Sequence, residues 1–299
     1  MIRSILVPMD GSPFGDRALP LAFALAQFHS ARVALATVHT ALPPSRTQGA
    51  PVIDPAFDND RRASAAQHLD RAVSLARDVG CRDPQRFLLD GEVLDRLEVF
   101  VRDYEIDLVV MSTHGRGGAA RAWLGSVAEG LLRRVSVPVL LTRVKHRMPE
   151  RGERLVPFSR VLVALDGSTV GEHIVDEVIR LMGSAPVHVT LAHVIQPAQT
   201  ALSPLVPSAI DAEVREHFLE PIASRIRSEG GTASVHVVVH GHAARALVAL
   251  ARSEQSDLIA LSTHGHRSLQ RLLLGNVADK IIRSSPVPVL VCRRQEDPR

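Results

Sequence analysis

Hydrophobic and polar positions along the chain follow two alternating periods. Continuous apolar runs are typical of strands buried on both faces of a sheet, and the first half predicts strands at residues 5–9, 33–38, 86–89, 108–111 and 137–141. Segments with apolar residues three and four positions apart predict helices at residues 12–28, 63–79, 92–104 and 126–134. We expect Ser12 to be the N-cap of the first helix and Pro13 its first helical residue.

This strand–helix alternation predicts the α/β class. Parallel strands joined by right-handed helical crossovers form a doubly wound, Rossmann-like sheet with helices on both faces. In such sheets ligands bind beyond the carboxyl ends of the strands, where the strand order reverses. An Asp10-Gly-Ser motif follows the first predicted strand, and a Ser112-Thr-His-Gly motif follows the fourth. We therefore expect both motifs at one rim of the sheet.

The chain repeats this pattern. Residues 4–12 (SILVPMDGS) are similar to 160–168 (RVLVALDGS), residues 107–115 (DLVVMSTHG) to 257–265 (DLIALSTHG), and residues 137–141 (VPVLL) to 287–291 (VPVLV). The unequal spacing of these pairs needs only a longer loop in the first half, where residues 42–55 are Pro-rich. We predict tandem domains at residues 1–144 and 158–299, pseudo-two-fold related, each with a five-stranded parallel sheet. Residues 145–157 are predicted to be a linker.

Composition narrows the class of protein. With 45% hydrophobic and 22% charged residues, the chain is typical of a soluble globular protein. No apolar stretch approaches the roughly 20 residues that span a bilayer, and the N-terminus becomes polar too early for a signal peptide. We therefore expect a cytoplasmic protein without a membrane partner. Cys81 and Cys292 are the only cysteines, which excludes a disulfide framework and a cysteine-ligated metal site.

Nucleic acid is not an expected partner. The formal net charge is only +3, and the arginines are scattered rather than clustered. Aromatic residues, which stack on single-stranded bases, make up only 3% of the chain.

A candidate phosphate site follows the fourth predicted strand. Gly115 lets the backbone turn tightly and approach a ligand closely. After nine intervening residues, Gly125-Ser126 precedes a helix, whose first backbone N–H groups attract anions. Ser126 adds a hydroxyl donor, and Arg116 adds a cation for the outer phosphates. These residues predict a cradle for a polyphosphate.

Over nearly the whole chain, and twice, these motifs resemble the universal stress protein family. Its ATP-binding pattern is glycine, two residues, glycine, nine residues, glycine, then serine or threonine. The resemblance implies ATP, with Mg²⁺, as the cofactor, an aspartate that contacts the adenosine, and a valine whose backbone contacts adenine. The motifs and the resemblance together assign to ATP binding Asp10, Val38, Met111, Ser112, Gly115, Arg116, Gly125, Ser126 and Val127 in the first half, and Asp166, Val194, Leu261, Ser262, Gly265, Gly275, Asn276 and Val277 in the second.

The sequence departs from the family pattern at three positions. Ser112 and Ser262 replace the first glycine, and each adds a Cβ where the backbone approaches phosphate. Asn276 replaces the hydroxyl residue; it is bulkier than serine, although it still donates a hydrogen bond. We therefore expect the first half to be the better nucleotide site.

Simpler interpretations of some residues stay open. Asp10 also fits a turn-capping role, which Asx residues commonly have. No carboxylate is placed by the sequence to orient His114 or His264, so we expect loop packing or a ligand contact rather than acid–base catalysis. The histidine pairs at 240/242 and 264/266 lack a third ligand in register, so no metal site is predicted.

The last strand of each half, at residues 137–141 and 287–291, is very apolar for a sheet edge. Edges of that kind are usually paired or covered, so we predict that the two strands associate between the halves. The resemblance implies the same, because family members dimerise through their last strand. Whether two chains pair further, as a homodimer, stays open.

The leading hypothesis is a nucleotide-dependent regulatory or stress-response protein and not an enzyme. A Walker-type loop is missing, and the only lysines, Lys145 and Lys280, lie in the predicted linker and in a predicted helix. No catalytic residue is assigned, because phosphoryl transfer requires positioned cations and a carboxylate for Mg²⁺. Two alternatives stay open: a slow ATPase that uses the same pocket, and a scaffold whose pocket no longer binds nucleotide.

Overall fold

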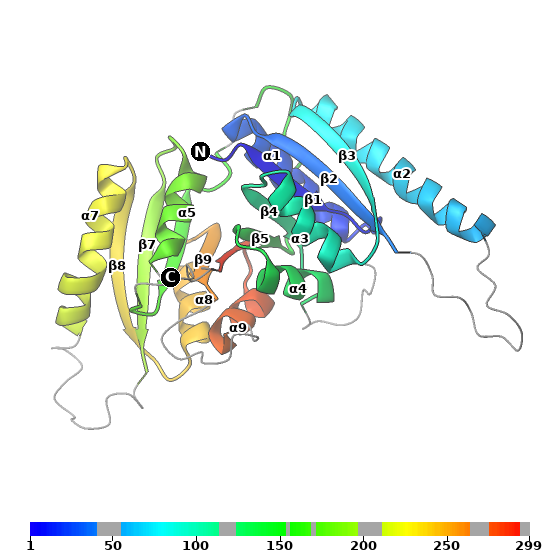
Figure 1. The fold of residues 1–299 in the computed structure, drawn as a ribbon. Helices are drawn as coiled ribbons and strands as arrows, with labels where there is room; N and C mark the ends of the chain where they lie inside the picture. Colours follow the sequence, from blue (N-terminus) through cyan, green and yellow to red (C-terminus); the bar gives the residue numbers. More distant parts are fainter. Residues whose placement is uncertain are drawn as a thin grey trace, which may run out of the picture.

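The strands form one continuous sheet of ten, in the order β3-β2-β1-β4-β5-β10-β9-β6-β7-β8. Strands β3 and β2 lie near one end of the sheet and β7 and β8 near the other (Figure 1). The computed structural model describes residues 1–40, 55–113, 124–153, 156–168, 172–196, 211–263 and 275–293. The strands of the first half are β1 (Ser4–Pro8), β2 (Arg32–His39), β3 (Arg82–Asp90), β4 (Leu108–Ser112) and β5 (Val139–Thr142). Those of the second half are β6 (Arg160–Leu165), β7 (His188–Ile195), β8 (Thr232–Val239), β9 (Leu258–Ser262) and β10 (Val289–Cys292).

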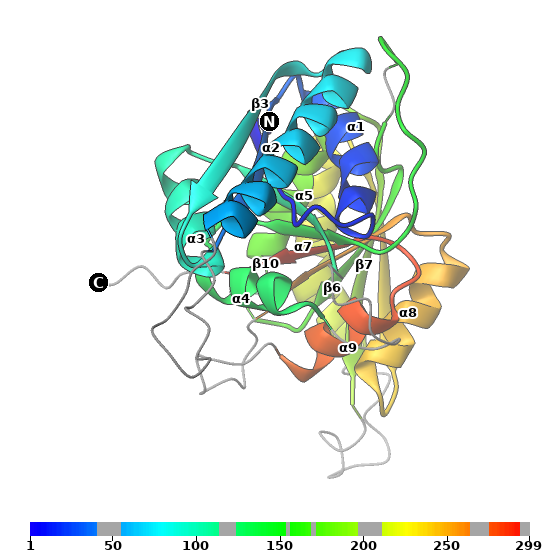
Figure 2. The ribbon, with the colours of Figure 1, turned by 90° about the vertical axis from the view of Figure 1, so that its right-hand side faces the viewer.

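Helices cover both faces of this sheet. The helices of the first half are η1 (Gly15–Ala18), α1 (Leu19–His29), α2 (Pro55–Asp78), α3 (Val93–Asp103) and α4 (Ser126–Arg134). Those of the second half are α5 (His173–Met182), η3 (Val214–Leu219), α7 (Glu220–Ser228), α8 (Ala243–Ser253) and α9 (Asn276–Ser284). Buried side chains of α1, α2, α5 and α7 pack on one face (α1 and α2 in Figure 2), and those of α3, α4, α8 and α9 pack on the other. Central strands such as β4, buried at all five positions, are continuous apolar runs for this reason.

Within each half, the strand pairs are parallel. The order of the first half is β3-β2-β1-β4-β5. It reverses between β1 and β4, which lie side by side with Ile5 paired to Leu108. The second half repeats this arrangement, with β6 beside β9. The predicted doubly wound α/β fold, with five parallel strands in each half and helices on both faces, is therefore confirmed, and the two sets of five strands are halves of one sheet.

The two halves meet at β5 and β10, which pair in the antiparallel direction. Leu140 lies opposite Leu290, and these two side chains are 0% and 1% exposed. The last strand of each half therefore has its outer edge occupied by the other half of the same chain. Both leucines belong to one hydrophobic core that draws residues from both halves.

Two polar contacts add to this connection. Arg180 on α5 donates to Asp107 Oδ1 at 3.0 Å, while Asp107 Oδ2 accepts the backbone N–H of Arg3 and Ser4 at 2.8 and 3.1 Å. His29 at the end of α1 places its Nε2 3.1 Å from the carbonyl oxygen of Leu181 on α5. A carbonyl oxygen only accepts, so Nε2 of His29 is the donor.

His29 makes the stability of this junction depend on pH. Burial lowers the pKa of His29 from 6.5 to about 4. Between these values the unfolded chain binds a proton that the folded chain excludes, so stability falls as the pH drops from 6.5 towards 4. We expect His29→Gln, which retains an N–H donor, to reduce this loss by about 2 kcal/mol. Urea unfolding at pH 7 and pH 4.5 checks it; equal losses in both proteins would contradict the assignment.

The first helix begins later than the sequence predicts. Ser12 donates its N–H and its hydroxyl to Asp10 Oδ1, at 3.0 and 2.7 Å, and its Oγ accepts the N–H of Gly15 at 3.1 Å. The short helix η1 follows this turn, and α1 starts only at Leu19, with Pro20 in its first turn. Ser12 thus makes the hydrogen bonds of an N-cap, to the N–H groups of Gly15 and Asp16. The prediction that the helix starts at Pro13 is wrong, because Ser12 and Asp10 form a turn ahead of η1.

Candidate functional site

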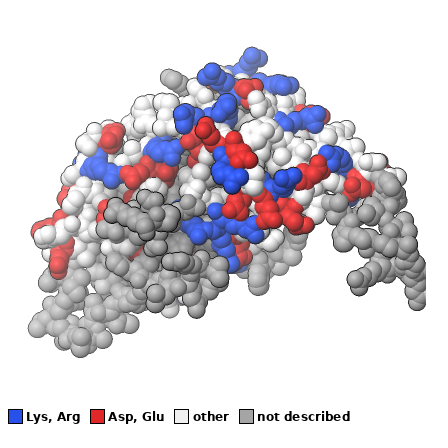
Figure 3. Space-filling view, viewed as in Figure 1, with Lys and Arg blue, Asp and Glu red and all other residues white. Residues whose placement is uncertain are grey.

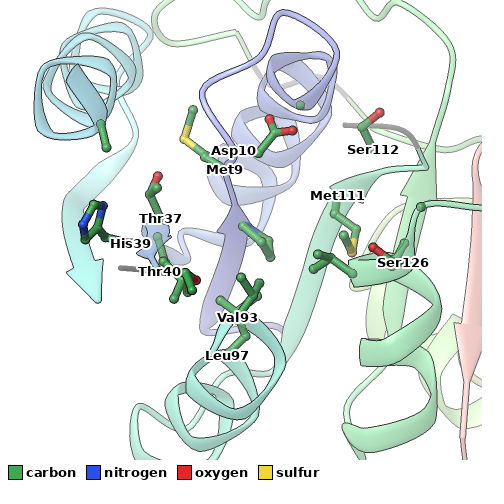
Figure 4. A pocket seen from close by; sticks show the side chains of 18 of the residues that line it. Met9, Asp10, Thr37, His39, Thr40, Val93, Leu97, Met111, Ser112 and Ser126 are labelled. Carbon is green, nitrogen blue, oxygen red and sulfur yellow. The ribbon is translucent and has the colours of Figure 1, made fainter. Parts of the chain in front are cut away.

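A cavity of about 900 Å³ opens at the carboxyl ends of β1, β2 and β4. It lies where the strand order reverses between β1 and β4, the position at which sheets of this kind bind ligands. Residues of α2 line one side, and residues of α3 and α4 line the others (Figure 4). Val93 and Leu97 of α3 give the cavity an apolar floor.

The polar end of the cavity is the N-terminus of α4. Its N-cap is Gly125, which has no side chain to cap the first backbone N–H groups of the helix. The N–H of Gly125 donates to the carbonyl oxygen of Thr113 at 2.8 Å, and a Cβ at Gly125 would lie 3.2 Å from that oxygen. Glycine thus lets α4 start close to the end of β4. Ser126 and Val127, the first two helical residues, line the cavity, and the helix dipole there favours an anion.

The end of β2 presents backbone groups to the same cavity. Met9, directly after β1, donates its N–H to the carbonyl oxygen of Ala36 at 2.7 Å, whereas Gly91 donates to that of His39 at 3.1 Å on the β3 side. Backbone groups of successive strand residues point to opposite neighbours, so Val38 directs its N–H and C=O to the same side as Ala36. Because β1 has ended at this level, the peptide edge of Val38 faces the cavity.

Asp10 closes a turn and lines the cavity at the same time. Its Oδ1 holds Ser12, as described above, and Gly11 has a φ of +76°, in the region that favours glycine. A Cβ at Gly15 would lie 2.6 Å from Asp10 Oδ1, so glycine at position 15 leaves room for the carboxylate. The turn-capping interpretation of Asp10 is therefore right, and it also places the carboxylate on the cavity wall (Figure 4).

The structure brings together every described residue that the sequence assigns to the first site. These lining residues are Asp10, Val38, Met111, Ser112, Gly125, Ser126 and Val127. Gly115, Arg116 and Gly265 lie outside the described residues, as do His114 and His264. Of the predicted phosphate cradle, the structure therefore describes the helix start at Gly125 and Ser126 but not the residues from 114 to 123.

The sequence did not predict the part of the cavity wall that α2 and two further residues of β2 form. Thr37 and His39 line the cavity from β2. His39 Nε2 lies 3.0 Å from both carboxylate oxygens of Asp58 on α2, and His68 Nε2, also on α2, lies 2.8 Å from Asp16 Oδ1. These pairs hold α2 beside the cavity. A histidine at the end of a predicted strand was a signal in the sequence, but its partner stands 19 residues later, and no motif or periodicity connects the two.

The second half repeats two features of this site, the Asp-Gly-Ser turn and the glycine N-cap of the helix. Asp166 Oδ1 accepts the N–H and the hydroxyl of Ser168 at 3.0 and 2.6 Å. Gly275 is the N-cap of α9, and a Cβ there would lie 3.1 Å from the carbonyl oxygen of Thr263. The other described candidates of this half stand at the end of β7, at the end of β9 and at the start of α9: Val194, Leu261, Ser262, Asn276 and Val277.

The wall of the second half differs from that of the first. By strand register, His193 takes the position of Thr37. Its Nδ1 lies 3.0 Å from the carbonyl oxygen of Leu165, and its ring lies edge-on to Phe218 with the centroids 6.2 Å apart. An imidazole therefore stands where the first half has a small hydroxyl side chain, in addition to Asn276 in place of Ser126. The two halves do not offer the same site.

Histidines elsewhere form no metal cluster in the described part of the chain. His240 Nδ1 accepts the backbone N–H of His242 at 2.9 Å, so this pair belongs to a turn. In the described ranges, no three or more His, Cys, Asp or Glu side chains are grouped to hold a metal ion.

Surface charge is mixed on the face seen in Figure 3, where acidic and basic side chains alternate. Several of them form exposed ion pairs, such as Arg86 with Asp70 at 2.8 Å. Among the described helices, none is both long and apolar enough to cross a bilayer.

The fold and site define an α/β protein with a ligand cavity at the sheet's switch point. The profile of the universal stress protein family matches residues 1–143 and 157–293, and the chain belongs to this family. The chain is similar to Universal stress protein Rv2005c of Mycobacterium tuberculosis, with 29% identity over 194 residues, 64% of this chain and 63% of that protein. It is also similar to Universal stress protein Slr1230 of Synechocystis, with 24% identity over 223 residues, 74% of this chain and 69% of that protein.

Solved structures support the same fold. A universal stress protein from Archaeoglobus fulgidus superposes with a TM-score of 0.68 at 22% identity, covering 98% of this chain and 97% of that one. A functionally unknown protein from Pseudomonas aeruginosa superposes with a TM-score of 0.63 at 20% identity, covering 98% and 92%. At these identities the similarity establishes the architecture alone.

Proposed function

We propose that the first half binds an adenine nucleotide, ATP with Mg²⁺. In this proposal the bound nucleotide regulates the protein and is not the substrate of a reaction. One observation carries this proposal: the helix start at Gly125 and the peptide edge of Val38 face one cavity of about 900 Å³ from two sides. Amide groups at a helix start suit phosphates. A strand's N–H and C=O suit the donor and acceptor edge of a purine base.

Asp10 supplies the third element of the proposed site. It lies on the wall between the other two groups, after β1 (Figure 4). A carboxylate is an acceptor for two hydroxyls, which fits a ribose between base and phosphates. The site needs no catalytic group for this role. A cytoplasmic location and a nucleotide-dependent partner protein belong to the same proposal.

Gly125→Val tests the phosphate end. Gly125 has φ −60° and ψ 145°, a conformation that valine adopts readily. Its Cβ would lie 3.2 Å from the carbonyl oxygen of Thr113, so the fold is expected to persist with a shift of a few tenths of an ångström at the start of α4. The added side chain stands at the start of α4 and is expected to lower ATP affinity at least tenfold, a loss of about 1.4 kcal/mol or more. Calorimetry on ligand-stripped protein, with and without Mg²⁺, measures this.

The same titration separates the alternatives. Wild-type protein that binds no adenine nucleotide under either condition would contradict the proposal and leave a scaffold. Steady ATP turnover that disappears in Gly125→Val would favour a slow ATPase instead. If a well-folded Gly125→Val variant binds ATP with wild-type affinity, the phosphates do not bind at the start of α4, and this part of the proposal is wrong.

A further inference from the structure

Two of the five methionines of the chain lie on the wall of the cavity. Met9 follows β1 and Met111 belongs to β4, the adjacent strands at which the strand order reverses. Their side chains belong to the cores on opposite faces of the sheet, so they flank the cavity from both sides. Figure 4 shows both thioethers among the lining side chains.

These methionines are buried in the fold but are reached through the cavity. Met9 is 5% and Met111 is 6% exposed. Met182 is equally buried, at 6%, but lines a void of only about 10 Å³, at the limit of what one water molecule needs. Met1 is 73% exposed. Met148 is partly buried against the core. The chain therefore contains an open thioether, a partly buried one, an enclosed one, and two that face a cavity large enough for small molecules.

The second half has leucine at both equivalent positions, Leu165 and Leu261. Leucine fills about the same volume as methionine, so packing alone does not require sulfur in the first half. The difference is chemical: a thioether accepts an oxygen atom from a peroxide, and an alkyl side chain does not.

The two cysteines are poor competitors for an oxidant. Burial raises the pKa of Cys81 to about 12 and raises that of Cys292 well above its usual range. Both side chains are buried, at 7% and 3% exposure. Because the thiolate is the reactive form, these thiols react slowly with peroxide near neutral pH.

We propose that Met9 and Met111 form an oxidation site inside the nucleotide cavity, at which a small peroxide converts the thioethers to sulfoxides and thereby closes the site to nucleotide. This inference rests on the proposed function of the cavity. In the reaction the sulfur of each thioether attacks one oxygen of hydrogen peroxide. The O–O bond breaks, an S–O bond forms, sulfur loses two electrons, and the other oxygen leaves as water after proton transfer.

The sulfoxide changes the cavity in two ways. It adds an oxygen atom to each side of the cavity wall, and it places a strong dipole among apolar neighbours. Bound nucleotide covers both sulfur atoms and is expected to slow their oxidation. Methionine sulfoxide reductases reverse the reaction, so the closure is reversible.

Peroxide treatment followed by peptide mass spectrometry tests the site. In nucleotide-free protein, we expect Met9 and Met111 to be oxidised at least fivefold faster than Met182, with Met1 fastest. ATP should slow oxidation of Met9 and Met111 at least fivefold and leave Met1 unchanged. Oxidation of Met182 at the rate of Met9 and Met111 would overturn the proposal, because it would show that the cavity gives no special access.

Calorimetry before and after peroxide tests the consequence. We expect the affinity of wild-type protein and of Met182→Leu for ATP to fall at least tenfold, and reductase treatment to restore it. The double variant Met9→Leu/Met111→Leu is compared with its own untreated sample, and peroxide should change its affinity less than twofold. An unchanged affinity in oxidised wild type would overturn the closure. If untreated wild type binds no nucleotide, the proposed function fails, and the oxidation rates without nucleotide still decide whether the site exists.

Discussion

Replacing Asp10 by alanine is expected to lower the affinity for ATP between about tenfold and a hundredfold, the effect of losing hydrogen bonds to a charged group. The substitution removes the carboxylate that we assign to the ribose and also releases Ser12 from the turn beside the cavity. Asp10→Asn retains one oxygen acceptor for the turn and is expected to lose less. Calorimetric titration of both variants gives the two affinities.

The second half supplies a matched control for this experiment. Asp166→Ala removes the equivalent turn, with Ser168 bound at 3.0 and 2.6 Å, far from the first cavity. We expect this variant to keep the ATP affinity that we propose for the first half. Equal losses in Asp10→Ala and Asp166→Ala would show that the turn matters only for folding, and the assignment of Asp10 to the ligand would be wrong.

Leu140→Ala is expected to give the largest loss of stability, about 3 kcal/mol, because it leaves a void at the junction of the two halves. Leu140 is fully buried and lies opposite Leu290 across the antiparallel β5–β10 pair. Urea unfolding followed by far-UV circular dichroism measures the change in the free energy of unfolding.

Leu75 on α2 is the control for Leu140, because it is 43% exposed. Leu75→Ala should change the free energy of unfolding by less than about 0.5 kcal/mol, as surface substitutions usually do. Comparable losses in the two variants would mean that the β5–β10 junction contributes little to stability.

The architecture could be predicted because two independent signals agreed. Continuous apolar runs indicate strands buried on both faces, and the repeated Asp-Gly-Ser and Ser-Thr-His-Gly motifs place two carboxyl ends of strands at one rim. The edge strand β3 was predicted too short, at four residues instead of nine. It lies at the end of the sheet, where polar residues face solvent and no apolar run marks its extent.

Residues that line the cavity were predictable where they belong to a motif or to the family resemblance, as Val38 does. Asp10 and Gly125 are motif residues, and both line the cavity. The wall formed by α2 depends on the contact between His39 and Asp58, 19 residues apart, which no motif or periodicity in the sequence connects. The start of the first helix was predicted too early for a similar reason, because a side-chain hydrogen bond between Ser12 and Asp10 forms a turn ahead of η1.

The antiparallel β5–β10 pair has a consequence for how the protein responds to its surroundings. When partner strands belong to separate chains, dilution dissociates them, and any property of the pair varies with protein concentration. Here a short connecting segment keeps one half near the other at an effective concentration of about millimolar, whatever the amount of protein. A nucleotide response that depends on the junction should therefore have the same midpoint at nanomolar and at micromolar protein.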